Sequence, residues 1–123
     1  ALFDGHRQLA NFQPSLFYAI QVVRKPAGGW VTAFGGGYYG SAAGKAPVVY
    51  QPGSLIPTGT EGFGEVQTPF QDPGASVNLG DLVILRPAKA GEPLERFNYV
   101  YPLSDGIVGE PMPTYRGEGK NFG

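Results

Sequence analysis

Glycine and proline punctuate this chain more densely than any other feature, with 20 glycines and 12 prolines among 123 residues. Both residues disfavour helix interiors, glycine through its conformational entropy and proline through its missing N–H group. No window shows a sustained 3.6-residue period of apolar residues, so we expect no long helix. Many turns joined by short apolar segments are typical of β structure.

The hydrophobic fraction of 41% and the aromatic fraction of 13% supply enough apolar surface for a folded core. A chain of this length makes one domain of ordinary size. We therefore predict an all-β fold, either a small antiparallel β-barrel or a sandwich with short loops and little helix. The prediction is a single β domain that spans residues 1–123.

Two hairpins are predicted from local turn signals. In the first, residues 16–24 and 30–34 flank a turn at 25–29. In the second, residues 97–103 and 106–108 flank a turn at Ser104-Asp105. Further short strands are expected at 47–50, at 64–68 (ended by Pro69) and at 82–85, which is the clearest apolar strand.

The formal net charge is -1, which gives no long-range attraction for nucleic acid or an anionic membrane. Cysteine is absent, so disulfides and thiolate metal sites are excluded, and a reducing compartment is indicated. No stretch approaches the ~20 apolar residues of a membrane span, and the N-terminus lacks a signal-peptide pattern. We expect a cytoplasmic protein with neither nucleic acid nor membrane as a partner.

Charge is concentrated near the C-terminal end. The chain has nine basic and ten acidic residues, and eight of these nineteen lie in the segments 86–97 and 113–120. Loops at strand ends often carry function, so this placement points to a site. A plain structural alternative treats the first segment as a solvated turn, with ion pairs worth little, and the second as a mobile tail.

The segment Glu65-Val66-Gln67-Thr68 alternates like a strand, which puts Glu65 and Gln67 on one face and Val66 and Thr68 on the other. A half-exposed strand explains the same pattern. The glycine run at 35–37 is not followed by a helical pattern, as a phosphate loop requires, so we favour a bulge or a tight crossing of backbones. His6, the single histidine, has no nucleophile or ligand cluster near it and is expected at the surface or in a cap.

A series of motifs along the chain carries a resemblance to a known family: Phe17-Tyr18-Ala19 with Val22-Val23-Arg24, Phe34-Gly35-Gly36-Gly37-Tyr38, Gly64-Glu65-Val66-Gln67-Thr68-Pro69, Gly80-Asp81, Pro87-Ala88-Lys89-Ala90-Gly91-Glu92 with Glu95-Arg96-Phe97, and Pro113-Thr114-Tyr115-Arg116-Gly117-Glu118-Gly119-Lys120. Together they resemble the C-terminal domain of the amino acid deaminase/aldolase proteins, relatives of D-threonine aldolase and D-serine dehydratase. The resemblance covers nearly the whole chain, and its last two motifs are the most specific.

The resemblance implies part of a pyridoxal-phosphate lyase that acts on β-hydroxy D-amino acids by deamination or retro-aldol cleavage. In this family an alanine-racemase-like barrel precedes a small β domain, and the barrel holds the lysine that binds the cofactor. None of the four lysines of this chain matches that position: Lys25, Lys45, Lys89 and Lys120. The expected partners are therefore an N-terminal barrel domain and a second subunit of a homodimer, and the chain alone is expected to be inactive.

Metal-dependent members of the family carry a Pro-x-His-x-Cys or Pro-x-His-x-Asp pattern, where this chain has Pro87-Ala88-Lys89-Ala90-Gly91. An ammonium group and a glycine cannot ligate a metal, so no metal is expected, and the charge of Lys89 is a candidate replacement. The resemblance implies catalytic roles for Lys89, Tyr115 and Arg116. The candidates for substrate binding are Glu65, Gln67, Glu92 and Arg96.

Two functions of other classes remain open. The chain could be a free-standing module that binds carbohydrate or a small ligand through the exposed aromatic residues Trp30, Tyr38 and Tyr39. It could also be a purely structural dimerisation domain.

Overall fold

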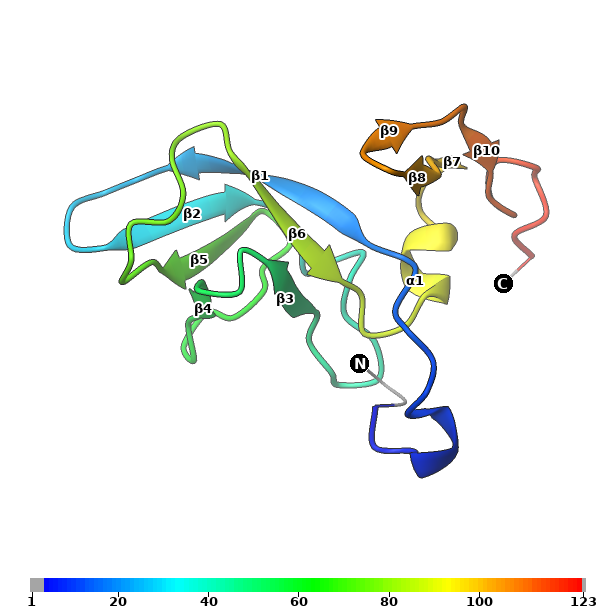
Figure 1. The fold of residues 1–123 in the computed structure, drawn as a ribbon, viewed down its shortest axis with the longest axis horizontal. Coiled ribbons are helices and arrows are strands. Elements are labelled where there is room, and N and C mark those ends of the chain that lie inside the picture. Colours follow the sequence, from blue (N-terminus) through cyan, green and yellow to red (C-terminus); the bar gives the residue numbers. More distant parts are fainter. Residues whose placement is uncertain (1–3, 123) are drawn as a thin grey trace. The chain divides into compact units, whose positions relative to one another are not determined.

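The computed structural model describes residues 4–122, so residues 1–3 and 123 of the predicted domain lie outside the description. The chain divides into two compact units, which are described separately. Unit 1 runs from Ala1 to Lys89 and unit 2 from Ala90 to Gly123. The regular structure of both units is mostly β-strand, connected by long loops (Figure 1), and helix makes up 6% of the structure.

Unit 1 contains a six-stranded antiparallel sheet that nearly closes into a barrel. The strands follow the order β3-β6-β1-β2-β5-β4 across the sheet. Their bounds are β1 (Tyr18–Arg24), β2 (Trp30–Phe34), β3 (Val48–Gln51), β4 (Ile56–Pro57), β5 (Gln67–Gln71) and β6 (Leu82–Arg86). The all-β prediction is confirmed, and so is the first hairpin, because β1 and β2 pair across the turn at 25–29.

The core of unit 1 forms on the inner face of this sheet, where alternate residues of neighbouring strands meet. Val31 lies directly opposite Phe70, and Ile20 lies opposite Val83. Val31, Phe70 and Val83 have no exposed surface at all. Burial of side chains of this size stabilises the fold by about 1.5–3 kcal/mol each, so this cluster is the main source of stability in unit 1.

One strand differs from the prediction at Pro69, which lies within β5 and does not end it. The N–H of Asp72 donates to Gly29 (2.7 Å) and the C=O of Val66 accepts from Gly35 (2.7 Å), so even-numbered residues of this segment face β2. The nitrogen of Pro69 therefore faces the opposite side, where β4 pairs only with Phe70 and Gln71. A missing N–H costs no ladder hydrogen bond at that position.

The glycine run serves packing, as the sequence indicates. A Cβ at Gly37 would lie 2.1 Å from the carbonyl oxygen of Phe63, so only glycine allows this approach of two backbones. The carbonyl of Gly36 accepts the hydroxyl of Tyr18 at 2.8 Å, and that of Gly35 accepts the hydroxyl of Thr68 at 2.5 Å. The run is thus a crossing stabilised by buried hydroxyl groups.

A buried carboxylate organises the loop after β5. Asp72 is 2% exposed, and it accepts hydrogen bonds from the N–H (2.8 Å) and hydroxyl (2.7 Å) of Ser76 and from the N–H of Val77 (3.2 Å). Burial by itself raises the pKa of Asp72. The hydrogen bonds and the charge of Lys25 outweigh burial, and the pKa lies below its ordinary value.

Unit 2 consists of very short elements. These are the one-turn helix α1 (Gly91–Leu94) and the strands β7 (Tyr99–Val100), β8 (Leu103–Ser104), β9 (Ile107–Val108) and β10 (Met112–Pro113). The second predicted hairpin is present as β8 and β9, but its turn lies at Asp105-Gly106, one residue later than predicted. Both turn residues have positive φ, 51° and 78°, as a type I′ hairpin turn requires.

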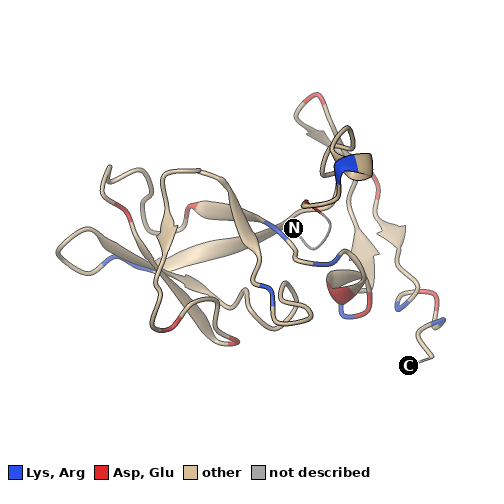
Figure 2. Cartoon of the chain, turned by 90° about the horizontal axis from the view of Figure 1, so that it is seen from below, with Lys and Arg blue, Asp and Glu red and all other residues tan. Residues whose placement is uncertain are grey.

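Outside these strands the described residues hold one further helical turn, η1 (Arg7–Leu9), whose exposed N-cap residue is His6. This agrees with the expected surface position of His6. Figure 2 shows the charged residues spread over loops and strand ends of both units. No helix among residues 4–122 is long and apolar enough to cross a membrane.

Candidate functional site

The helix α1 and the turn after β10 bring four predicted site residues into one polar cluster of unit 2. We call this set, Glu92, Arg96, Tyr115 and Arg116 together with Glu95, the polar cluster. Arg96 donates from Nη1 to the carboxylate of Glu92 at 2.5 Å and to its carbonyl at 2.9 Å. The i,i+4 spacing on a helical turn brings these two side chains together, and both are half-buried.

Tyr115 is held against the same helical turn. Its hydroxyl donates to the carbonyl of Gly91 at 3.4 Å. Burial raises the pKa of the Tyr115 phenol, and the carboxylates of Glu95 and Glu92 raise it further. The phenol therefore stays protonated at neutral pH and can donate a hydrogen bond.

The turn that presents Tyr115 and Arg116 is fixed by its neighbours. Thr114 is buried, donates its hydroxyl to the carbonyl of Phe97 (2.5 Å) and accepts the N–H of Gly117 (3.1 Å). A Cβ at Gly117 would lie 2.0 Å from the carbonyl oxygen of Asn98, so glycine is required there. In this structure the segment 113–120 is a turn held by hydrogen bonds and by the close approach of Gly117 to Asn98.

Glu95 was not singled out as a site residue by its own pattern, yet it lies at the centre of the polar cluster. Its carbonyl accepts Arg116 Nη1 at 3.5 Å and Asn121 Nδ2 at 3.2 Å. Its carboxylate lies close enough to affect the pKa of Tyr115. The sequence signals for Glu95 were its place in the charged segment 86–97 and in the motif Glu95-Arg96-Phe97.

Lys89 is the last residue of unit 1, and it is exposed. The two residues before it, Pro87 and Ala88, are buried, and the N–H of Ala88 donates to the carbonyl of Gly40 at 2.7 Å. The backbone is thus anchored immediately before Lys89. This anchoring presents the ammonium group to solvent at the end of a fixed segment.

Glu65 and Gln67 lie in unit 1 and are not part of the polar cluster. Glu65 precedes β5 and is exposed. Val66 is 71% exposed, whereas Thr68 is buried, so these two side chains do not share a buried face. The predicted alternation therefore holds only from Gln67 onward. Gln67 accepts a hydrogen bond from Arg24 and donates to Glu61 at 3.0 Å. Neither Arg24 nor Glu61 was predicted as a site residue, because Arg24 lies 43 residues from Gln67 in the sequence and Glu61 lies in a turn before β5.

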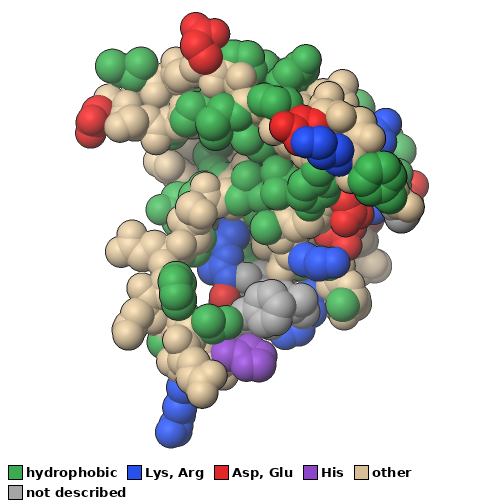
Figure 3. All heavy atoms as spheres, turned by 90° about the vertical axis from the view of Figure 1, so that its right-hand side faces the viewer, with side chains coloured by type: hydrophobic (Ala, Val, Ile, Leu, Met, Phe, Trp, Pro, Cys, Tyr) green, Lys and Arg blue, Asp and Glu red, His purple; other side chains and the backbone are tan. Residues whose placement is uncertain are grey.

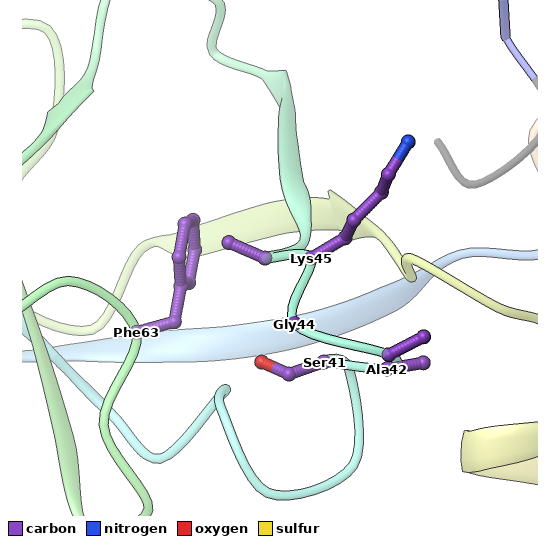
Figure 4. Close-up of a pocket in the computed structure, with 7 residues that line it drawn as sticks. Ser41, Ala42, Gly44, Lys45 and Phe63 are labelled. Atoms are coloured by element: carbon purple, nitrogen blue, oxygen red, sulfur yellow. The ribbon is translucent and has the colours of Figure 1, made fainter.

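One shallow pocket of about 380 Å³ lies in unit 1 (Figure 4). Its lining residues are Ser41, Ala42, Ala43, Gly44, Lys45, Ala46 and Phe63. The ammonium of Lys45 points away from the ring of Phe63, and the lining combines apolar side chains with the hydroxyl of Ser41 and polar backbone groups. None of the predicted site residues lines it.

The residues proposed for carbohydrate stacking separate into two kinds. Trp30 and Tyr38 are exposed, at 38% and 59%. Tyr39 is half-buried, and its ring packs edge-on against Tyr18 at a centroid distance of 5.0 Å. Tyr39 therefore packs against the core of unit 1, in contrast to the exposed rings of Trp30 and Tyr38.

No group of three or more His, Cys, Asp or Glu residues that could hold a metal ion lies together among residues 4–122. The polar cluster has only two carboxylates, and one of them is paired with Arg96. Its chemistry is that of hydrogen-bond donors and guanidinium groups, which orient anionic or hydroxyl-bearing ligands.

No family model matches the sequence, and no curated protein matches it. The fold does match a solved structure, that of D-threonine aldolase from Filomicrobium marinum, with a TM-score of 0.73 and 16% sequence identity. The likeness is one of fold. It covers 87% of this chain but only 29% of that chain, so this chain spans less than a third of the length of the similar enzyme. The resemblance inferred from the motifs is thereby supported at the level of fold.

Proposed function

We propose that this chain is the accessory C-terminal domain of a pyridoxal-phosphate lyase that acts on β-hydroxy D-amino acids, by deamination or retro-aldol cleavage. The observation that carries the proposal is the fold likeness to D-threonine aldolase over 87% of this chain. It agrees with the resemblance of the motifs. In this proposal the chain lines the active site beside an alanine-racemase-like barrel and belongs to a cytoplasmic homodimer.

The chain's own residues do not fit the cofactor. Lys25 donates to the carbonyl of Val77 at 2.5 Å and to Asn78 at 3.3 Å, and Lys120 pairs with Glu118 at 2.9 Å. Lys45 and Lys89 are exposed. None of these amines lies in an enclosed cavity, where a lysine that bonds to a cofactor must lie, so in this proposal the barrel supplies the cofactor site.

In this proposal the chain contributes polar and charged side chains to catalysis. The hydroxyl of Tyr115 is a hydrogen-bond donor for a substrate oxygen once it gives up its long 3.4 Å bond to the carbonyl of Gly91, and Arg116 and Lys89 provide positive charge for a substrate carboxylate or hydroxyl. Glu92 and Arg96 form an ion pair beside Tyr115. Glu65 and Gln67 are assigned to substrate binding on the resemblance alone.

Lys89 is proposed to replace the metal of the metal-dependent relatives, since it stands at the position of a metal ligand in their pattern. The experiment uses the longer natural protein that contains this chain. That protein should carry a yellow, borohydride-reducible cofactor and cleave or deaminate a β-hydroxy D-amino acid without added metal. Lys89→Ala should lower kcat/KM by about 100-fold, whereas the matched change Lys45→Ala should leave it unchanged. An unaltered kcat/KM in Lys89→Ala would exclude this role.

A further inference from the structure

Gln67 lies at the centre of a hydrogen-bonded network on the outer face of the sheet in unit 1. Arg24 donates from Nη2 to Oε1 of Gln67, and Gln67 donates from Nε2 to Oε1 of Glu61 at 3.0 Å. The oxygen of the amide thus faces a guanidinium group, and its nitrogen faces a carboxylate. The reverse orientation would turn donors toward donors and an acceptor toward an acceptor. The network therefore fixes the direction in which the amide points.

A β-bulge directs Arg24 into this network. The register of β1 against β2 shifts between Val22, which pairs with Ala33, and Arg24, which pairs with Thr32. In an unshifted register Arg24 would lie on the face of Val22, which is buried in the core. The shift moves Arg24 to the face of Thr32 instead. Bulges that redirect a side chain in this way are common next to active sites.

The hydrogen bond from Arg24 passes over a neighbouring strand. β2 lies between β1, which ends with Arg24, and β5, which begins with Gln67 (Figure 1). Thr32 lies on the face of β2 over which the bond passes, and it is only 8% exposed. Trp30 and Phe34 on the same face of β2 are 38% and 64% exposed. The side chain of Arg24 is thus held across the sheet and covers Thr32.

Gln67 lies at the same end of the sheet as Lys89. β2 and β6 are both antiparallel to β1, so they end on the same side, and β5 begins there because it is antiparallel to β2. The loop after β2 contacts both neighbourhoods. The N–H of Gly35 donates to the carbonyl of the residue before Gln67 at 2.7 Å, and the carbonyl of Gly40 accepts the N–H of the residue before Lys89 at 2.7 Å. Two residues proposed to face the substrate are therefore anchored to one loop.

The network keeps unused hydrogen-bonding capacity. An amide nitrogen carries two hydrogens, and a carboxylate accepts at both oxygens. Within the part of the chain that the structure describes, the second N–H of Gln67 and the second oxygen of Glu61 have no partner. A hydroxyl group both accepts and donates, so it can accept from Gln67 and donate to Glu61. A carboxylate in the same place would be repelled by the charge of Glu61, so the pair favours a neutral hydroxyl.

We propose that Gln67 and Glu61 recognise the β-hydroxyl group of the substrate, and that Arg24 is a positioning residue, which acts by fixing the amide of Gln67. The proposal rests on the lyase function proposed above and deepens it, because it names the groups that distinguish a β-hydroxy D-amino acid from one without the hydroxyl. Charge alone does not mark this site, since charged side chains are scattered among apolar ones on the face that Figure 3 shows. The fixed amide and the bulge distinguish it.

The test compares two ligands of the full-length lyase of the proposed function that differ by one oxygen atom. D-Threonine is the substrate, and D-2-aminobutyrate, which lacks the hydroxyl, is the competitive inhibitor; D-serine and D-alanine form a second such pair. Gln67→Ala and Glu61→Ala should each lower kcat/KM for D-threonine by about 10-fold or more, because each removes a hydrogen bond to the hydroxyl. The inhibition constant of D-2-aminobutyrate should stay unchanged. Glu110→Ala removes an exposed carboxylate of unit 2 and is the matched control, which should change neither constant.

A double-mutant cycle tests the role of Arg24. Arg24→Met should lower kcat/KM for D-threonine when Gln67 is present and have no further effect in the Gln67→Ala background, because Arg24 acts through that amide. A residue that merely stabilised the sheet would lower kcat/KM equally in both backgrounds. Arg7→Met, which removes an exposed arginine of η1, is the control and should have no effect in either.

The outcomes separate this proposal from the lyase proposal. A full-length protein that neither cleaves nor deaminates D-threonine or D-serine overturns both. A lyase whose kcat/KM is unchanged in Gln67→Ala and Glu61→Ala overturns the hydroxyl site alone. Parallel losses for D-threonine and D-2-aminobutyrate also overturn it, because the two ligands share every group except the hydroxyl. Equal effects of Arg24→Met in both backgrounds overturn the positioning role of Arg24.

Discussion

Different interactions stabilise the fold of unit 1 and the fold of unit 2. Unit 1 has a continuous core in which Val31, Phe70, Val83 and Leu85 are fully buried. In unit 2, residues 101–113 are all exposed, and the fixed points are polar: the Glu92–Arg96 pair and the hydrogen bonds of Thr114. A region with a core can keep its shape alone, whereas a region fixed by a few polar contacts is suited to be completed by a partner or a ligand.

The largest effect should come from the core of unit 1. Phe70→Ala removes a fully buried ring and should lower the free energy of unfolding by about 3–5 kcal/mol. Ile107→Ala, at a position 72% exposed, should change it by less than about 0.5 kcal/mol in dilute, monomeric protein. Urea unfolding of both variants compares the units directly. Equal losses would mean that unit 2 has a core of its own.

The buried carboxylate of unit 1 should make its stability depend on pH. The pKa of Asp72 is lowered in the folded chain, so its stabilising effect is complete above the ordinary value of 3.8 and is lost as the pH falls through the folded pKa. Asp72→Asn should cost about 2 kcal/mol at pH 7. The difference in the free energy of unfolding between the variant and the wild type should become smaller below pH 3.8, which urea unfolding at each pH measures. A gap that stays constant would show that the charge of Asp72 contributes nothing.

In unit 2 the substitution expected to disturb the local fold replaces a glycine. Gly117→Ala places a Cβ against the carbonyl of Asn98, so the turn 113–120 must shift, at a cost on the order of 1–2 kcal/mol. Hydrogen exchange should then be faster at the amide of Glu118, which donates to Thr114 at 2.9 Å. Gly74→Ala, where a Cβ meets nothing within 4 Å, is the control. Unchanged protection of Glu118 would show that the turn does not depend on this close approach.

The sequence was a good guide where the interactions are local. The hairpin of β1 and β2 follows from the turn at 25–29, and the apolar run of β6 needs only β-branched residues and leucine. Strand partners distant in sequence, such as β1 with β6, leave no local pattern. Pro69 was misjudged for the same reason, because its tolerance depends on where β4 stops pairing.

The candidate site was predictable to a similar degree. Spacing of four residues connects Glu92 with Arg96, and both were chosen from the sequence. The approach of Tyr115 to Gly91, 24 residues away, depends on the turn that Thr114 and Gly117 fix. Glu95 entered the cluster through its backbone carbonyl, and a backbone contact has no residue-type signal. The hydrogen bonds from Arg24 to Gln67 and from Gln67 to Glu61 join side chains, but Arg24 lies 43 residues from Gln67, so no local spacing predicts them.

The hydroxyl groups of two tyrosines, one in each unit, allow a comparison of the two units at a single atom. The hydroxyl of Tyr18 in unit 1 donates to the carbonyl of Gly36 at 2.8 Å within the packed sheet. The hydroxyl of Tyr115 in unit 2 lies at the surface beside the carboxylates of Glu92 and Glu95. Replacing either residue by phenylalanine removes a single oxygen atom. We expect the first hydroxyl to serve the fold and the second to serve the chemistry.

The most direct measurement is therefore kcat/KM, together with Tm, for Tyr18→Phe and Tyr115→Phe in the full-length lyase of the proposed function, with a β-hydroxy D-amino acid as substrate. Tyr115→Phe should lower kcat/KM by about 100-fold or more with little change in Tm. Tyr18→Phe should lower stability by about 1 kcal/mol and leave kcat/KM nearly unchanged. An unaltered kcat/KM in Tyr115→Phe would contradict the assignment of the polar cluster to the active site.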